Sequence, residues 1–227
     1  MNGTLSVVAT PIGNLADITL RALDTLRQAD VIACEDTRVS SKLLARYEIQ
    51  KPLVIFHAQS NKSATTRILS MLAEGKHVAL VTDAGTPGIS DPGSALVREV
   101  RDRLKGEVRI EALPGPSAVA AALSIAGVPT DEFTFLGFLP HKKGRQTLFK
   151  EICASERTIV FYESPHRIEK ALASLAEGLP DTRRVIVLRE LTKIHESVVE
   201  GNAEEVAAHF SANPGQVRGE FVVIVAS

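Results

Sequence analysis

Short apolar runs alternate with amphipathic segments through the first half of the chain. Leucines recur at helical spacing between Leu20 and Leu26, and Asp17 precedes them as the expected helix cap. Ser63 is the expected cap of a later helix that stops near Gly75. The apolar runs predict strands over Leu5–Ala9, Val31–Cys34, Leu53–Phe56, Val78–Thr82 and Val108–Leu113. Such alternation predicts a mostly parallel sheet with helices on both faces.

The pattern changes after the Pro114–Pro116 segment. An alanine-rich stretch over residues 117–126 predicts a helix, and new strand-like runs follow it. These runs are Phe133–Phe138, Thr158–Tyr162, Val185–Leu188, Ser197–Glu200 and Phe221–Val225. We therefore expect two α/β domains, over residues 1–115 and 116–227.

Composition fits an ordinary globular protein, with 227 residues of which 44% are hydrophobic and 23% charged. No apolar run approaches the roughly 20 residues of a membrane helix, and Met1 to Leu5 lacks the start of a signal peptide. Cys34 and Cys153 belong to no metal-binding pattern, so we expect buried or half-buried thiols, no metal site and a cytoplasmic protein. A net charge of −1 gives no global attraction to nucleic acid, so RNA binding would need a local basic patch or a partner.

The most informative loop is Thr82–Gly93, which directly follows a predicted strand. It holds three glycines and two prolines but lacks the lysine with which phosphate-binding loops hold phosphates. Asp83, Ser90 and Asp91 could accept hydrogen bonds from amino or hydroxyl groups while glycine backbone approaches closely. This chemistry fits a small zwitterionic or nucleoside ligand. The alternative is a structural turn with a helix cap at Asp91 or Ser94.

Two further loops follow predicted strands in the first domain. Ala9–Leu15 contains Pro and Gly and opens a helix, so it is either a ligand-facing turn or a simple strand-to-helix connection. In Leu113–Val119 a rigid turn leads to Ser117, which can cap a helix, and to Ala118, beside which a planar ligand could lie. The alternative for this second loop is a plain linker between the domains.

Charged residues follow strands in the second domain. Glu163 and Glu190 could accept a proton, while Arg167, Arg189 and Lys193 could hold a phosphate. The alternative is a helix start at Ser164-Pro165 and an ordinary ion pair. A basic run could also bind phosphates, unless it is plain solvated surface: it comprises His141, Lys142, Lys143 and Arg145.

Five segments together resemble the tetrapyrrole methylase superfamily, and more narrowly its branch that methylates small-subunit ribosomal RNA. They are VVATPIGNLADITLRAL, VTDAGTPGISDPG, LPGPSA, FLGFLP and FYESPHR, in order over nearly the whole chain. The resemblance implies a homodimer with a mostly parallel N-terminal sheet, a mixed C-terminal sheet, and S-adenosylmethionine in the cleft between the two domains. The family usually has Gly-Asp-Pro where this chain has Gly85-Thr86-Pro87, so no acidic role passes to Thr86.

The resemblance also implies the site and the substrate. The substrate would be the ribose 2′-hydroxyl of a cytidine in the decoding region, within an assembled small subunit. Residues expected at the methyl donor are Pro11, Asp83, Gly85, Ile89, Ser117, Ala118, Leu136 and Tyr162. Catalytic candidates are Glu163, Arg189, Glu190 and Lys193. Candidates for RNA binding are Lys142, Lys143, Arg145 and Arg167.

Three other functions remain possible from the sequence. A methylase of the same fold could act on a tetrapyrrole or a modified protein histidine, although the basic run and the Gly85-Thr86-Pro87 variant argue against it. A nonenzymatic RNA-binding or assembly factor would not need the donor-type loops. A nucleotide-binding enzyme is disfavoured by the missing loop lysine.

Overall fold

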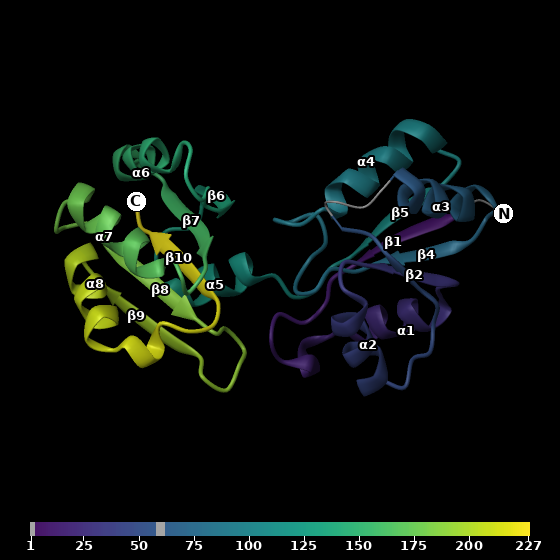
Figure 1. Cartoon of the computed structure of the whole chain (residues 1–227), viewed down its shortest axis with the longest axis horizontal. Coiled ribbons are helices and arrows are strands. Elements are labelled where there is room, and N and C mark those ends of the chain that lie inside the picture. The colour runs from purple at the N-terminus through teal and green to yellow at the C-terminus, as the bar shows by residue number, and fades with distance from the viewer. Residues whose placement is uncertain (1–2, 58–61) are drawn as a thin grey trace. The chain divides into compact units, whose positions relative to one another are not determined.

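The computed structural model describes residues 3–57 and 62–227 of the chain. The chain divides into two compact units, Met1–Ser117 (unit 1) and Ala118–Ser227 (unit 2). Each unit contains one five-stranded sheet covered by helices (Figure 1). The division falls two residues beyond the boundary expected from the sequence, because the turn through Pro116 packs with the loops of unit 1.

All neighbouring strands of the unit 1 sheet are parallel, as the strand–helix alternation predicts, and their order is β3-β2-β4-β1-β5. The strands are β1 (Thr4–Val8), β2 (Val31–Cys34), β3 (Leu53–Ile55), β4 (His77–Leu80) and β5 (Arg109–Leu113). The chain runs from β1 to β2 and β3 in one direction, then returns through β4 and beyond β1 to β5. Since crossovers between parallel strands are right-handed, this reversal places helices on both faces.

Side chains alternate across the unit 1 sheet and so feed two separate cores. Ile32 and Cys34 of β2 pack with α1 (Leu20–Gln28) and α2 (Thr37–Arg46). Val31 and Ala33 of the same strand pack on the other side. The helices there are α3 (Lys62–Ala73) and α4 (Gly93–Leu104). Both faces of the sheet are therefore buried, which agrees with the continuous apolar run of β2.

Two of the helix caps predicted for unit 1 were wrong. Thr19, not Asp17, caps α1, since its Oγ1 accepts a hydrogen bond from a first-turn amide at 3.1 Å. Asp17 instead lies in the 3-10 turn η1 (Leu15–Asp17), one turn too early to reach those amides. Ser63 lies inside α3 and not before it. The predicted stop at Gly75 is confirmed by its left-handed φ of 85° just after the helix.

Unit 2 has a mixed sheet with the order β6-β7-β10-β8-β9, as expected. Only β6 and β7 are parallel, and the other three pairs are antiparallel. The strands are β6 (Phe133–Phe138), β7 (Thr158–Glu163), β8 (Val185–Arg189), β9 (Ser197–Gly201) and β10 (Phe221–Val225). Every residue of β10 is buried, which confirms that its uninterrupted apolar run lies inside a sheet.

Three helices share one apolar core with the unit 2 sheet: α6 (Arg145–Ala154), α7 (Ile168–Gly178) and α8 (Ala203–Ala212). Helix α5 (Ala118–Ala126) contacts β10 separately. Cys34 is buried and Cys153 half-buried, and both thiols are free, as the sequence predicted. Among the described residues, no helix combines the length and apolar character needed to cross a membrane.

The unit 1 core provides a matched test of the fold within one helix. Leu26 of α1 is 1% exposed, whereas Leu20 of the same helix is 81% exposed. We expect Leu26→Ala to lower the free energy of unfolding by about 2–5 kcal/mol, because it removes buried methyl groups and leaves a cavity. Leu20→Ala should change it by no more than about 0.5 kcal/mol. Urea denaturation of both variants measures the difference, and equal losses would contradict the assigned core.

Candidate functional site

Three loops of unit 1 meet where β1, β4 and β5 end. We call residues 9–15, 82–93 and 114–117 the loop cluster. Thr10 and Gly85 form a backbone pair, with N···O distances of 2.9 and 3.0 Å. Thr10 Oγ1 also donates to the Thr82 carbonyl at 3.1 Å, and Thr86 Oγ1 donates to the Pro116 carbonyl at 3.0 Å. These bonds join all three loops at the edge where parallel sheets bind ligands.

Gly85 occupies a backbone conformation that other residues rarely adopt, with φ of 86°. A Cβ placed there would lie 3.5 Å from Ile12 Cγ2 and 3.8 Å from the Pro116 carbonyl oxygen. The space in front of Gly85 is thus bordered by the other two loops and is open enough for ordinary contact. Ile89, further along the same loop, is 45% exposed and presents an apolar surface.

Asp91 holds the second loop in shape. Its carboxylate accepts hydrogen bonds from the Gly88 amide at 2.8 and 2.9 Å, and from the Gly93 amide at 2.7 Å. Helix α4 begins at Gly93, so this side chain also binds one of the unpaired amides at the helix start. Asp91 therefore stabilises the turn and the helix start, which is part of the structural alternative expected from the sequence. Asp83 and Ser90 remain the polar residues of this loop that could bind a ligand.

Acidic residues lie beside the loop cluster, at the ends of β2 and β4. Asp83 accepts a hydrogen bond from the Asp36 amide at 3.1 Å, and Glu35 accepts one from Thr82 Oγ1 at 3.2 Å. Burial raises the pKa of Glu35 and of Asp83, and a neighbouring carboxylate raises each further. Hydrogen bonds from Arg38 lower the pKa of Asp36 to about 2. Negative charge here favours a ligand with a positive group.

In unit 2, Tyr162 joins an aromatic group on β6 and β7. Its ring lies edge-on to Phe135 and Phe138, with centroids 4.9 and 5.4 Å away. Burial raises the pKa of Tyr162, and a backbone hydrogen bond with Val119 opposes this. Tyr162 therefore lies next to the start of α5, which begins at Ala118. Leu136 follows Phe135 on β6. It packs against the unit 2 core but is only partly buried.

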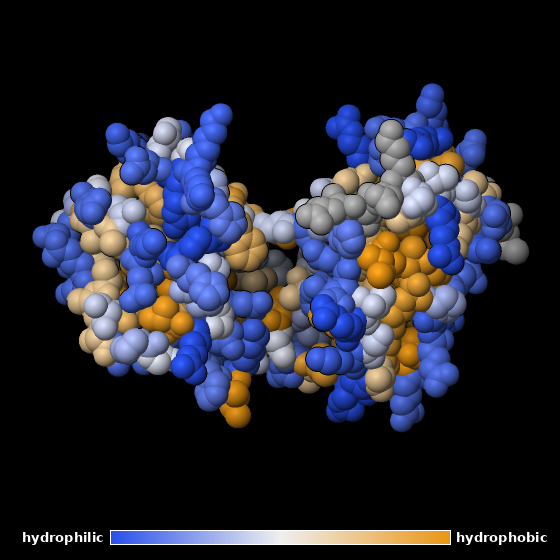
Figure 2. Space-filling view, in the orientation of Figure 1, coloured by the Kyte–Doolittle hydropathy of each residue, from blue (hydrophilic) through white to orange (hydrophobic). Residues whose placement is uncertain are grey.

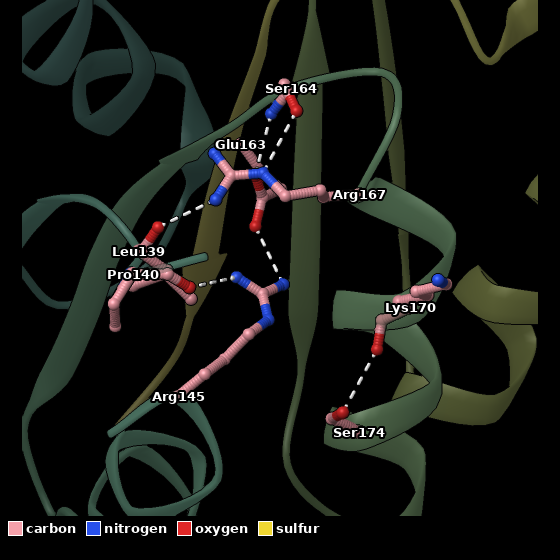
Figure 3. Close-up of polar contacts among 8 residues, drawn as sticks. All are labelled: Leu139, Pro140, Arg145, Glu163, Ser164, Arg167, Lys170 and Ser174. Atoms are coloured by element: carbon pink, nitrogen blue, oxygen red, sulfur yellow. Dashed lines mark hydrogen bonds and ion pairs between the residues drawn. The ribbon is translucent and has the colours of Figure 1, made fainter. Parts of the chain in front are cut away.

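Glu163 lies at the end of β7 between two arginines (Figure 3). Arg145 Nη2 is 2.8 Å from Glu163 Oε2, and Arg167 Nε is 2.9 Å from Glu163 Oε1. The Ser164 amide donates to Oε1 at 2.8 Å. Glu163 is 1% exposed, so both of its oxygens are enclosed by donors of the protein itself.

This geometry argues against three of the roles expected from the sequence. A carboxylate paired with two guanidinium groups is not available to take a proton from a substrate, so Glu163 does not fit the role of a base. Arg145 and Arg167 are mostly buried, and each also donates to a backbone carbonyl. Their guanidinium groups are therefore turned inward, away from a phosphate at the surface.

Glu190 and Lys193 form a second, separate ion network. Lys193 Nζ lies 2.9 Å from Glu190 Oε1 and 2.8 Å from Glu220 Oε2. Burial opposes both charges, but these bonds outweigh it, so the pKa of Glu190 is lowered and that of Lys193 is raised. Arg189 donates to the Arg218 carbonyl at 2.8 Å and to the His195 carbonyl at 3.0 Å. These contacts secure the loops around β8 and β10 and disfavour Glu190 or Lys193 as a base.

The basic run is divided by the structure. His141, Lys142 and Lys143 are exposed in the turn between β6 and α6, whereas Arg145 is turned inward to Glu163. Hydrophilic residues gather over this turn in Figure 2. Only part of the run is therefore available to an external phosphate.

Comparison with known proteins decides the family. Residues 4–207 match the model of the Tetrapyrrole (Corrin/Porphyrin) Methylases. The chain belongs to the tetrapyrrole methylase family. Two relatives carry the name ribosomal RNA small subunit methyltransferase I. The one from Xylella fastidiosa is 45% identical over 98% of this chain and 81% of its own length, and the one from Thermotoga maritima is 44% identical over 98% of both chains.

A solved structure confirms the tetrapyrrole methylase fold. It is the uroporphyrin-III C-methyltransferase from Thermus thermophilus, complexed with S-adenosyl homocysteine. The two folds superpose with a TM-score of 0.66 over 100% of this chain and 98% of that one, at 18% sequence identity. The resemblance based on five sequence segments is therefore confirmed, both for the family and for the α/β fold.

Sequence reasoning missed three charged residues beside the loop cluster. Glu35, Asp36 and Arg38 lie beside Asp83, and the signal for them was a pair of acids directly after the buried strand β2. Within residues 3–57 and 62–227, no group of three or more His, Cys, Asp or Glu is arranged to hold a metal ion. The loop cluster brings Pro11, Gly85 and Ser117 into neighbouring loops.

The acidic cluster of this tetrapyrrole methylase predicts a pH-dependent stability. Asp83→Asn removes a charge and keeps an oxygen for the Asp36 amide, so we expect a higher melting temperature at pH 7, with a gain of up to about 1 kcal/mol. Because the folded-state pKa of Asp83 is raised, its charge is unfavourable above that pKa. The gain should therefore disappear as the pH falls through the raised pKa and Asp83 takes up a proton.

Thermal melts between pH 3 and 8 measure this effect. Asp102→Asn is the matched control, since Asp102 lies on the surface of α4 and pairs with Arg98. That change should give no gain at pH 7. A gain for Asp83→Asn that persisted at pH 3 would contradict a charge effect.

Proposed function

We propose that this chain transfers a methyl group from S-adenosylmethionine to small-subunit ribosomal RNA. The observation that carries the proposal is about 45% identity, over nearly the whole chain, to relatives named ribosomal RNA small subunit methyltransferase I. The loop cluster of unit 1 supports a donor site, and the exposed cations between β6 and α6 support an RNA ligand. We also propose that the protein acts in the cytoplasm, where such a substrate would be found, and that it is a homodimer, as the family resemblance implies.

The residues of the loop cluster suit the chemistry of S-adenosylmethionine. In unit 1 the proposed donor residues are Pro11, Asp83, Gly85, Ile89 and Ser117. Gly85 has no side chain to block close backbone approach, Ile89 offers apolar contact, and the carboxylates beside Asp83 suit the donor's positive groups. In unit 2 we propose Ala118, Leu136 and Tyr162. When bound, the donor supplies an activated methyl group on a positively charged sulfur.

For the acceptor, we propose the 2′-hydroxyl of a cytidine in the decoding region, within an assembled small subunit. The net charge of −1 and the few exposed cations of the β6–α6 turn are too weak for tight binding to naked RNA. The shape of a folded particle would supply the missing specificity. Because Glu163 and Glu190 are both held in ion pairs, positioning of the two reactants is proposed as the main catalytic contribution.

Donor binding should depend on the absence of a side chain at Gly85, where the other two loops lie close. Gly85 and Gly106 share a φ of 86°, and nothing lies within 4 Å of a Cβ placed on Gly106. Valine at either position should lower the stability by about 1–2 kcal/mol through backbone strain. Only Gly85→Val should also weaken S-adenosylmethionine binding, by at least about tenfold or 1.4 kcal/mol. Titration calorimetry on folded variants tests this, and equal affinity in both would contradict a donor site at the loop cluster.

The substrate is tested directly with ribosomal particles. Purified protein should transfer labelled methyl groups to small subunits that lack the modification, and far less to the same RNA stripped of protein. The modified nucleotide should resist alkaline cleavage, because a 2′-O-methyl group removes the attacking hydroxyl. Methyl groups found on a base would contradict the ribose target, and equal activity on naked RNA would contradict the need for a particle. Absence of transfer to either substrate would contradict the proposed function.

A further inference from the structure

The turn between β6 and α6 has no regular structure of its own. Three basic residues, His141, Lys142 and Lys143, are exposed on it, and Gly144 adopts φ of 82° just before α6. A turn of this kind would sample many conformations if only the attached strand and helix restrained it. Binding RNA phosphates would then have to order it, at a cost in conformational entropy that weakens binding.

Two mostly buried arginines bind the backbone at the start of this turn (Figure 3). Arg167 Nη1 donates to the Leu139 carbonyl at 2.8 Å, and Arg145 Nη1 donates to the Pro140 carbonyl at 3.2 Å. The Arg145 amide also donates to the Lys142 carbonyl at 3.3 Å. The backbone just before His141 is thus tied to two arginine side chains, and the Lys142 carbonyl after it is tied to the backbone amide at the start of α6.

Glu163 orients both arginines. Its two oxygens bind one guanidinium each, at 2.8 and 2.9 Å, and its side chain is fully buried. Arg145 is further fixed by the ring of Phe149, whose centroid lies 5.1 Å from its guanidinium carbon. Buried ion pairs stabilise a fold no better than well-packed apolar groups, but they do hold side chains in defined directions. The effect of this network is therefore orientation of the turn.

We propose that Glu163 is a positioning residue for RNA: through Arg145 and Arg167 it fixes residues 139–144 so that Lys142 and Lys143 meet phosphates at a defined spacing. This inference rests on the proposed function for the identity of its ligand. It replaces a catalytic role for Glu163 and a direct phosphate-binding role for the two arginines.

Glu163→Gln separates positioning from simple charge. The change removes one negative charge, so charge alone predicts tighter binding to RNA. Positioning predicts the opposite, because a neutral amide cannot hold two guanidinium groups. We expect KM for small subunits to rise about tenfold, while kcat and the affinity for S-adenosylmethionine change less than about threefold. Glu200→Gln is the control, since Glu200 forms an exposed pair with Arg184 and should leave all three values unchanged.

Two further variants test the same route. Arg167→Lys keeps the charge but cannot hold Glu163 and the Leu139 carbonyl together, so it should raise KM for subunits in the same way. The double change Lys142→Ala and Lys143→Ala should weaken subunit binding and reduce its salt dependence by up to two phosphate contacts. Adding Glu163→Gln to that double variant should cause little further loss, since the turn then has no lysines to present.

Hydrogen exchange of the protein alone distinguishes failure of this inference from failure of the proposed function. Glu163→Gln should increase amide exchange over residues 141–144, while the β7 and β10 amides stay protected and show that the fold is intact. Unchanged exchange in the turn would overturn the positioning role whatever the substrate is. A large fall in kcat with an unchanged KM, together with the loss of one limb of the pH–rate profile, would overturn it in favour of a catalytic base.

Discussion

The backbone pair between Thr10 and Gly85 is the contact on which the unit 1 site depends. It joins the ends of β1 and β4, which are neighbours only because the chain reverses direction in the sheet. Gly85 makes both backbone bonds while it adopts a left-handed φ, and the next residue, Thr86, donates to the Pro116 carbonyl after β5. Since all three strands point the same way, one short pairing gathers three loops that are far apart in sequence.

Charged residues that follow strands in unit 2 serve mainly to hold backbone in place. Glu163 and Glu190 have the sequence context of catalytic carboxylates, since each directly follows or ends a buried strand. Each instead forms an ion pair: Glu163 with Arg145, and Glu190 with Lys193. A general base needs an oxygen that can come within hydrogen-bond distance of the proton it removes. The ion pairs of Glu163 and Glu190 therefore argue against either carboxylate as a base.

The sequence was sufficient for the strands, the two units and the family, because apolar runs and glycine-proline loops depend on local pattern. It failed where the answer depends on which side chain reaches which atom. Asp17 and Thr19 are both good helix caps by type, and only the 3-10 turn before α1 decides between them. Arg145 belongs to a basic run by sequence, yet it points inward because Glu163, 18 residues later, is the partner that parallel pairing of β6 and β7 brings close.

The net charge of −1 does not describe the local charge at either candidate site. Glu35, Asp36 and Asp83 gather beside the loop cluster of unit 1. In unit 2 the basic turn stands over two arginines that share one carboxylate, which leaves one positive charge beneath its lysines. Because interactions between exposed charges fade within roughly 8–10 Å at physiological salt, each ligand responds to its local field and not to the total. A near-neutral chain can therefore attract a cationic donor at one place and RNA phosphates at another.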